Sequence, residues 1–194
     1  DYSTRPVTSK RLTSDLEEVT QLIDNIPNYY SNQGTNVDAG LEKANLLLSE
    51  SEASKKIVIL LSDGGPTYFN YNNKVYGTGN SDSKVCINGA DRCSDSLKKS
   101  PSMAAEEEAS LMKKDGITIY TIGFAITDNS KAATFLKEVS TPFMQDGKNT
   151  YQNFFLAKDS AALELQFDHI ATAITTIATD AKVVDVIPLG FTLD

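Results

Sequence analysis

The sequence predicts an α/β protein with a doubly wound, mostly parallel sheet and helices on both faces. The first observation is a pair of apolar runs, residues 57–61 and 117–126, which are bounded by Lys or Gly and are typical of strands buried on both faces. The second is a series of segments around these runs in which apolar residues recur at helical spacing. Helices that alternate with buried strands are typical of parallel sheets, in which ligands bind beyond the carboxyl ends of the strands.

Two helices are predicted before the first strand. Ser14 and Glu17 have the spacing of a capping box, and Pro27 ends the helix that they begin. The apolar stripe of this helix consists of Leu16, Val19, Leu22, Ile23 and Ile26. The second helix begins at about Val37, directly after the loop Gly34-Thr35-Asn36.

Residues 66–100, after the strand at 57–61, interrupt this alternation. They are rich in Asn, Ser, Gly and Tyr and have no sustained periodicity. We interpret them as an arm inserted between a strand and the next helix. The stretch Gly77 to Lys84 within it lacks the spacing of a phosphate-binding loop.

Regular elements resume after the arm. The sequence predicts, in order, a helix at 101–114, a strand at 117–126, a helix at 131–139, a polar loop with a short apolar piece at 153–157, a long helix from 160 and a strand at 182–187. Ser100 with Pro101 is a typical helix start, and Asp159 caps the long helix. The inner stripe of the long helix consists of Leu163, Phe167, Ile170, Ile174 and Ile177.

The composition argues against several classes of function. The chain has 26 acidic and 18 basic residues and a formal charge of −8, which argues against nucleic-acid binding. No apolar run approaches about 18 residues, so membrane insertion of this segment is not predicted. There is no G-x-S-x-G nucleophile elbow, and His169 is assigned to a helix edge. We therefore predict no catalytic residues and no enzyme activity.

The two cysteines, Cys86 and Cys93, lie in the arm. A zinc site normally needs four ligands, and the single histidine, His169, is far away in the sequence. A short disulfide loop is the sharper interpretation, and two unpaired thiols are the alternative. A disulfide would indicate that the protein works outside a reducing cytosol.

Two loops carry candidate ligands for a cation. Thr35 precedes a helix, and Asp63 follows the most apolar strand within Ser62-Asp63-Gly64-Gly65. A hydroxyl and a carboxylate on neighbouring strand-end loops can supply oxygen ligands to a small divalent cation. The alternative is that Thr35 is a helix cap and Asp63 an ordinary turn residue.

Three segments of the chain resemble the von Willebrand factor type A family. They are GTNVDAGLEKA, KKIVILLSDGGPT and ITIYTIGF, in this order. The resemblance implies a metal-ion-dependent adhesion site that binds Mg²⁺, Mn²⁺ or Ca²⁺. It implies that Thr35 is the threonine of the family's second loop and that Asp63 is the aspartate of its third loop.

The family's first loop, D-x-S-x-S, has no clear counterpart. Residues 1–5, DYSTR, begin in the same way, but the fifth residue is Arg5 and only one helix fits between them and Thr35. We therefore interpret residues 1–187 as a partial type A domain without the first β-α unit, and residues 188–194 as the start of a connection to a following module. A degenerate first motif at Asp1 is the alternative. A partial domain would leave strands without partners, so a complementary chain or fragment is expected to supply the missing strand and helix.

The arm follows Asp63 directly and contains four aromatic residues near its start. Tyr68, Phe69, Tyr71 and Tyr76 are predicted to bind a ligand, and the alternative is that they pack the arm onto the domain. Together with its composition, the arm resembles those of adhesins at the tips of Gram-positive pili. This resemblance implies an extracellular location at the cell surface, in the cell wall or a pilus of a Gram-positive bacterium.

The leading functional hypothesis is an adhesion module that binds a host or extracellular-matrix protein through a cation held by Thr35 and Asp63. The second is a structural or assembly scaffold of a pilus or surface protein, without a working metal site, which the absence of the first loop favours. The third is a hydrolase or phosphotransferase in which Asp63 is the reactive carboxylate, although the sequence offers no partner base.

Overall fold

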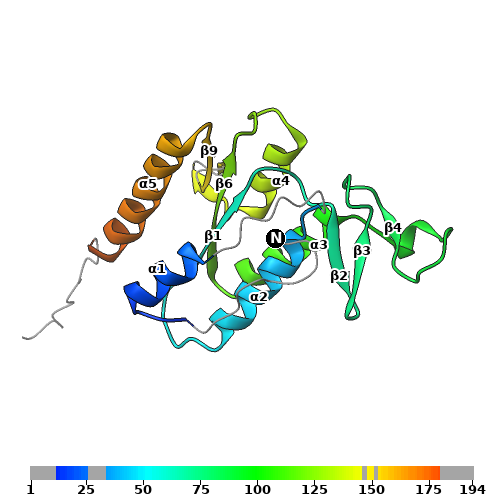
Figure 1. The fold of residues 1–194 in the computed structure, drawn as a ribbon, viewed down its shortest axis with the longest axis horizontal. Helices are drawn as coiled ribbons and strands as arrows, with labels where there is room; N and C mark the ends of the chain where they lie inside the picture. The colour runs from blue at the N-terminus through cyan, green and yellow to red at the C-terminus, as the bar shows by residue number, and fades with distance from the viewer. Residues whose placement is uncertain (1–11, 26–33, 146–147, 151–152, 180–194) are drawn as a thin grey trace, which may run out of the picture.

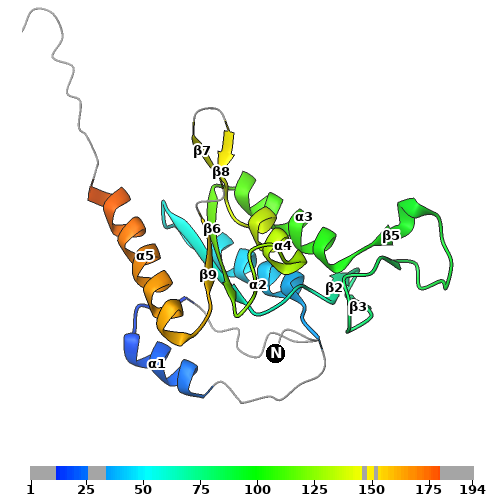
Figure 2. The same ribbon diagram turned by 90° about the horizontal axis from the view of Figure 1, so that it is seen from above.

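The computed structural model describes residues 12–25, 34–145, 148–150 and 153–179. At its centre lies a three-stranded sheet in the order β1 (Lys56–Ser62), β6 (Ile117–Phe124) and β9 (Phe154–Ala157). Both strand pairs are parallel. Helices lie on both sides of the sheet, which confirms the predicted fold class (Figure 1; Figure 2).

Three helices cover one face of the sheet. They are α2 (Val37–Ser49), α3 (Pro101–Lys114) and α4 (Lys131–Val139). Successive side chains of a strand point to opposite faces, so alternate residues of β1 and β6 enter the core on this side. This core consists of Val37, Leu41, Leu60, Ala105, Ala109, Met112, Ile117, Ile119, Phe135, Leu136 and Val139.

The opposite face is covered at β6 and β9 by α5 (Ser160–Thr179). Ile170 of α5 packs with Tyr120 and Ile122 of β6 in a second core cluster, and Leu163 and Ile174 lie against it. Phe167 is exposed, so its predicted place on the inner stripe is wrong. Although Phe167 is only three residues from Ile170, it lies at the edge of the apolar stripe of α5, and the centre of this stripe packs on β6 and β9. The side chain of Ile177 lies outside the described part of the chain.

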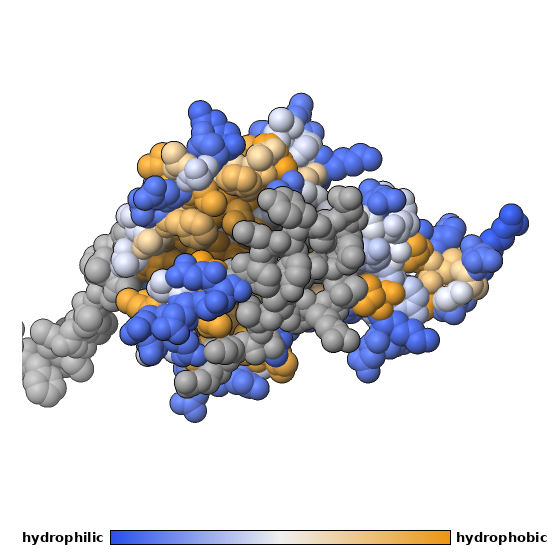
Figure 3. Space-filling model, in the orientation of Figure 1, coloured by the Kyte–Doolittle hydropathy of each residue, from blue (hydrophilic) through white to orange (hydrophobic). Residues whose placement is uncertain are grey.

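The prediction that β1 is buried on both faces is wrong. Leu60 and Ser62 are buried on the side of the three helices, but Ile59 is 39% and Leu61 36% exposed. The reason is that β1 is an edge strand of the described sheet, while α5 packs mainly with β6 and β9. Figure 3 shows apolar side chains around a hollow beside α5. The open face of β1 is therefore an exposed apolar surface.

The helix α1 (Leu16–Asp24) precedes the sheet in the chain. Asp15 and not Ser14 caps it, because the Asp15 carboxylate accepts hydrogen bonds from the N–H groups of Glu17 and Glu18 at 3.0 and 3.1 Å. The predicted capping box is thus wrong by one residue. No residue of α1 is buried, and Leu16 on its apolar stripe is 80% exposed.

The arm forms two small antiparallel hairpins on the side of the domain away from α5 (Figure 1; Figure 2). One pairs β2 (Tyr68–Tyr71) with β3 (Lys74–Gly77), and the other pairs β4 (Val85–Cys86) with β5 (Lys98–Lys99). A short 3₁₀ helix, Asp95–Leu97, precedes β5. Asn72 and Asn73 turn the first hairpin with φ angles of +48° and +60°.

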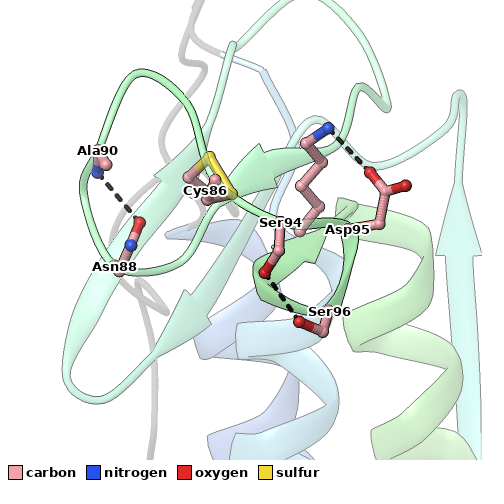
Figure 4. The surroundings of a disulfide bond; sticks show 8 residues. Cys86, Asn88, Ala90, Ser94, Asp95 and Ser96 are labelled. Carbon is pink, nitrogen blue, oxygen red and sulfur yellow. Dashed lines mark hydrogen bonds and ion pairs between the residues drawn. A yellow bond between two sulfur atoms is a disulfide. The ribbon is translucent and has the colours of Figure 1, made fainter.

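Cys86 and Cys93 form a disulfide with a Cα–Cα distance of 6.0 Å, which confirms the favoured interpretation of the cysteines. Figure 4 shows the bridge at the base of a loop in which Asn88 Oδ1 accepts a hydrogen bond from the N–H of Ala90 at 3.1 Å. The bridge closes the chain between β4 and the 3₁₀ helix.

The remaining elements agree with the predicted order. The caps Ser100 and Asp159 accept hydrogen bonds from Met103 N–H and Ala162 N–H at 3.3 and 2.8 Å, as predicted. A further hairpin pairs β7 (Phe143–Gln145) with β8 (Lys148–Thr150). The predicted strand at 182–187, the boundary at 187/188 and the first-loop residues 1–5 lie outside the described residues.

Candidate metal centre

Thr35 and Asp63 line the same cavity, which has a volume of about 310 Å³. The cavity lies at the carboxyl end of β1, and Leu61, Phe124 and Leu163 form its apolar walls. The structure therefore brings together two residues that are 28 positions apart in the sequence (63 − 35 = 28). This placement agrees with the rule that ligands bind beyond the carboxyl ends of parallel strands.

The carboxylate of Asp63 lies in the turn that follows β1. The Ser62 hydroxyl donates a hydrogen bond to the carbonyl of Gly64 at 2.9 Å, which fixes the turn around Asp63. Within the described residues, the carboxylate of Asp63 itself forms no hydrogen bond or ion pair, and the residue is exposed. A Cβ atom added at Gly64 or Gly65 would meet nothing within 4 Å, so the turn that follows Asp63 is not crowded by the rest of the chain.

The backbone of Thr35 is fixed by hydrogen bonds. Its N–H donates to Thr67 Oγ1 at 2.8 Å, and its carbonyl accepts from the N–H groups of Thr67 and Tyr68 at 2.8 and 3.0 Å. The helix cap is Asn36, whose Oδ1 accepts from Ala39 N–H at 3.0 Å, so the alternative of Thr35 as the cap is wrong. Among the described residues the Thr35 hydroxyl has no hydrogen-bond partner.

A hydroxyl and a carboxylate with free lone pairs fit a hard cation such as Mg²⁺, which binds few protein oxygens and retains several waters. Within ranges 12–25, 34–145, 148–150 and 153–179 there is no group of three or more His, Cys, Asp or Glu residues that could hold a metal ion. Thr35 and Asp63 would therefore be two of the ligands, and other oxygen atoms would complete the coordination shell.

A buried polar network beside Thr35 was not predicted from the sequence. The carboxylate of Asp38 accepts a hydrogen bond from Asn70 N–H at 2.8 Å, and the Asn36 side-chain amide donates to Asn70 Oδ1 at 3.1 Å. The pKa of Asp38 is raised to about 6, mainly by burial and less by the nearby carboxylates of Glu42 and Glu108, while the hydrogen bond from Asn70 N–H opposes the shift. The only signal of this network in the sequence is a polar residue, Asp38, in the first turn of a helix, and such a residue is too common to indicate a buried network.

The four aromatic residues of the arm differ in their exposure. Phe69 is fully buried and stacks on Tyr76 with ring centroids 5.7 Å apart, so the packing alternative holds for its side chain. Tyr71 meets the ring of Tyr76 edge-on. Tyr68 lies against Gly79, where an added Cβ atom would be 2.5 Å from the tyrosine oxygen. Tyr68, Tyr71 and Tyr76 are half-buried, and ligand binding by them stays a prediction.

The other groups considered in the sequence do not join this site. His169 is exposed on α5, as predicted. None of the described helices is long and apolar enough to cross a membrane.

A family model for the von Willebrand factor type A domain matches residues 1–169. The chain belongs to this family. The match confirms the resemblance found in the sequence. Comparison with curated protein sequences finds no significant match.

Several solved structures share the type A fold of this chain. The von Willebrand factor domain of the type V pili tip protein Mfa5 from Porphyromonas gingivalis has a TM-score of 0.69 and 22% identity, over 95% of this chain and 81% of that one. The pilus adhesin SpaC from Lactobacillus rhamnosus GG has a TM-score of 0.55 and 20% identity, over 81% of this chain and 21% of that one.

A third relative is a matrix protein. Proximal thread matrix protein 1 of the mussel byssus, with zinc in its MIDAS motif, has a TM-score of 0.56 and 18% identity. The match covers 89% of this chain and 33% of that one. The type A chain described here thus spans about a fifth of the adhesin and a third of the matrix protein.

Proposed function

We propose that this type A domain is a non-enzymatic adhesion module in which Thr35 and Asp63 hold a divalent cation that binds a protein partner. The observation that carries the proposal is that both side chains are free of partners among the described residues and line one cavity, while hydrogen bonds fix the backbone of Thr35. Mg²⁺, Mn²⁺ or Ca²⁺ would retain a coordination position for a carboxylate of the partner.

The walls of the cavity favour such a contact. Leu61, Phe124 and Leu163 surround the candidate ligands with apolar side chains. A cation in contact with a low-dielectric wall attracts a carboxylate more strongly than one in open water. We therefore expect the partner to present an Asp or Glu beside apolar side chains.

Other features support an extracellular location and a host or matrix protein as the partner. A disulfide is typical of proteins outside the reducing cytosol, which supports an extracellular location. The fold relatives include a pilus tip protein, a pilus adhesin and a matrix protein. These relationships support a role at the cell surface with a host or extracellular-matrix protein as the partner.

Calorimetric titration with Mg²⁺ and Mn²⁺ tests the proposal. We expect binding by the unchanged chain, loss of binding in Thr35→Val and Asp63→Asn, and no change in Asp91→Asn. Asp91 is a matched control because it is also exposed and carries the same charge but lies in the disulfide loop. Equal cation binding by all four proteins would refute the assignment of the ligands.

A scaffold without a metal site is the second candidate function. It is favoured by the presence of only two candidate ligands, with no group of three acidic, His or Cys residues in the described ranges. The same titration separates the two functions, since a scaffold is expected to bind neither cation.

A complementary segment is the other proposed partner. β1 is an edge strand of the described sheet, and its open face exposes Ile59 and Leu61. Exposed apolar edge strands are surfaces on which a further strand can pair. We propose that a strand and helix from another chain or a separate fragment cover this surface. Light scattering of the purified chain tests this, because a stable folded monomer of 21.1 kDa would contradict it.

A further inference from the structure

Thr35 is attached to the arm through its backbone and not through its side chain. The hydroxyl of Thr67 accepts a hydrogen bond from Thr35 N–H at 2.8 Å, and Thr67 N–H donates to the Thr35 carbonyl at 2.8 Å. Tyr68 N–H donates to the same carbonyl at 3.0 Å. Both polar backbone groups of Thr35 are thus bonded to the first residues of the arm.

The attachment continues along the first turn of α2. The Asn36 side-chain amide donates a hydrogen bond to Asn70 Oδ1 at 3.1 Å, and the Asp38 carboxylate accepts one from Asn70 N–H at 2.8 Å. Asn36 and Asp38 are both buried. Buried hydrogen bonds are costly to break, because each group that is left unpaired loses its solvation without compensation. The start of α2 and the strand β2 therefore move as one unit.

Thr67 packs closely against the loop Gly34-Thr35-Asn36 on one side and against β3 on the other. Gly34 has a φ angle of +80°, and a Cβ atom there would lie 2.3 Å from Thr67 Oγ1. A Cβ atom at Gly77 in β3 would lie 2.2 Å from the Thr67 carbonyl. Thr67 thus packs closely between the loop Gly34-Thr35-Asn36 and the hairpin β2–β3.

We propose that Thr67 is a positioning residue that sets the orientation of Thr35 and couples the hairpin β2–β3 to the candidate cation site. The hairpin carries the half-buried rings of Tyr71 and Tyr76, so a partner that contacts these rings acts on Thr35 through β2. Coupling between two sites is reciprocal, so a cation bound at Thr35 also stabilises the hairpin. The part that concerns cation affinity rests on the proposed function.

The test compares Thr67→Val with Thr67→Ser. Valine has nearly the shape of threonine but cannot accept the hydrogen bond from Thr35 N–H, whereas serine keeps the hydroxyl. The matched control is Thr78→Val, because the Thr78 hydroxyl bonds only to Ser81 within the arm. Should Thr67→Val not fold, Thr67→Ala serves instead, since it retains both backbone bonds to the Thr35 carbonyl.

Two measurements are made on each protein. The first is amide hydrogen exchange at Thr35 without added metal, and the second is calorimetric titration with Mn²⁺. In Thr67→Val we expect exchange at Thr35 to accelerate roughly tenfold and Mn²⁺ affinity to fall by about three- to tenfold, as for the loss of one buried hydrogen bond. Thr67→Ser and Thr78→Val should stay within about twofold of the unchanged chain on both measurements.

The outcomes separate this inference from the proposed function. Unchanged Thr35 exchange in Thr67→Val overturns the positioning role. Equal Mn²⁺ affinity in Thr67→Val and the unchanged chain overturns the coupling to the cation. Faster exchange in Thr67→Val, with no Mn²⁺ binding by any protein, supports the positioning role and refutes the proposed function alone.

Discussion

The carboxylate of Asp38, buried in the first turn of α2, accepts a hydrogen bond from the backbone N–H of Asn70 at 2.8 Å. This contact joins the domain to the inserted arm. It also places a titratable group in a site where burial disfavours its charged form.

The first prediction concerns the pH dependence of stability. The pKa of Asp38 is raised from 3.8 to about 6 in the folded chain, mainly by burial and less by Glu42 and Glu108, while the hydrogen bond from Asn70 N–H and the positive charge of Lys99 oppose the shift. Between these two values the folded state binds more protons than the unfolded state, so stability falls as pH rises from about 4 to 6. Urea unfolding at several pH values should show this fall in the unchanged chain and a flatter profile in Asp38→Asn.

Asp91→Asn is the control for this experiment, because Asp91 is exposed. It should keep the profile of the unchanged chain. Parallel profiles for the unchanged chain and Asp38→Asn would contradict a raised pKa at Asp38.

The second prediction concerns the two faces of β1. Leu60 is buried against the three helices, and the neighbouring Leu61 is exposed on the open face. Leu60→Ala should lower the free energy of unfolding by about 2–5 kcal/mol, as for other large-to-small core changes. In the chain without the proposed complementary strand and helix, Leu61→Ala should cost less, under about 1.5 kcal/mol, because Leu61 has less buried surface to lose than Leu60. A similar cost for both, measured by urea unfolding, would mean that another segment covers the open face.

The third prediction concerns the attachment of the arm to α3. The carboxylate of Asp82 accepts hydrogen bonds from both the N–H and the hydroxyl of Ser102, at 2.7 and 2.6 Å. An anion at a helix N-terminus is stabilising, so Asp82→Ala should lower the free energy of unfolding by about 1 kcal/mol. Asp91→Ala is the control without a helix contact. An unchanged midpoint of urea unfolding in Asp82→Ala would show that the contact is not stabilising.

The fourth prediction concerns the disulfide. Cys86 and Cys93 close a short loop, which on the chain-entropy model restrains the unfolded arm by about 2–3 kcal/mol. Reduction should therefore speed tryptic cleavage after the exposed Arg92, while the core of α2, α3 and β6 keeps its protection from hydrogen exchange. Cys86→Ser with Cys93→Ser should reproduce the reduced chain. Equal cleavage rates with and without the bridge would contradict the prediction.

Local features of the structure could be predicted from the sequence. The caps Ser100 and Asp159 and the strands β1 and β6 depend on residues within a few positions of one another. The cap of α1 was misplaced because Ser14 and Asp15 are adjacent and both can cap, and only the geometry chooses between them. The hairpins of the arm were missed because strands this short show no periodicity.

The sequence by itself predicted that Thr35 and Asp63 lie near one another, because Thr35 precedes a helix and Asp63 follows a strand of a parallel α/β sheet, in which such loops gather at the carboxyl edge of the strands; the structure places both residues on one cavity. Only the tertiary structure decided that β1 is open on one face, because burial depends on which helix covers a strand and not on the strand itself. It alone also showed that Thr67 fixes Thr35, because a hydrogen bond between residues 32 positions apart has no signal in local sequence.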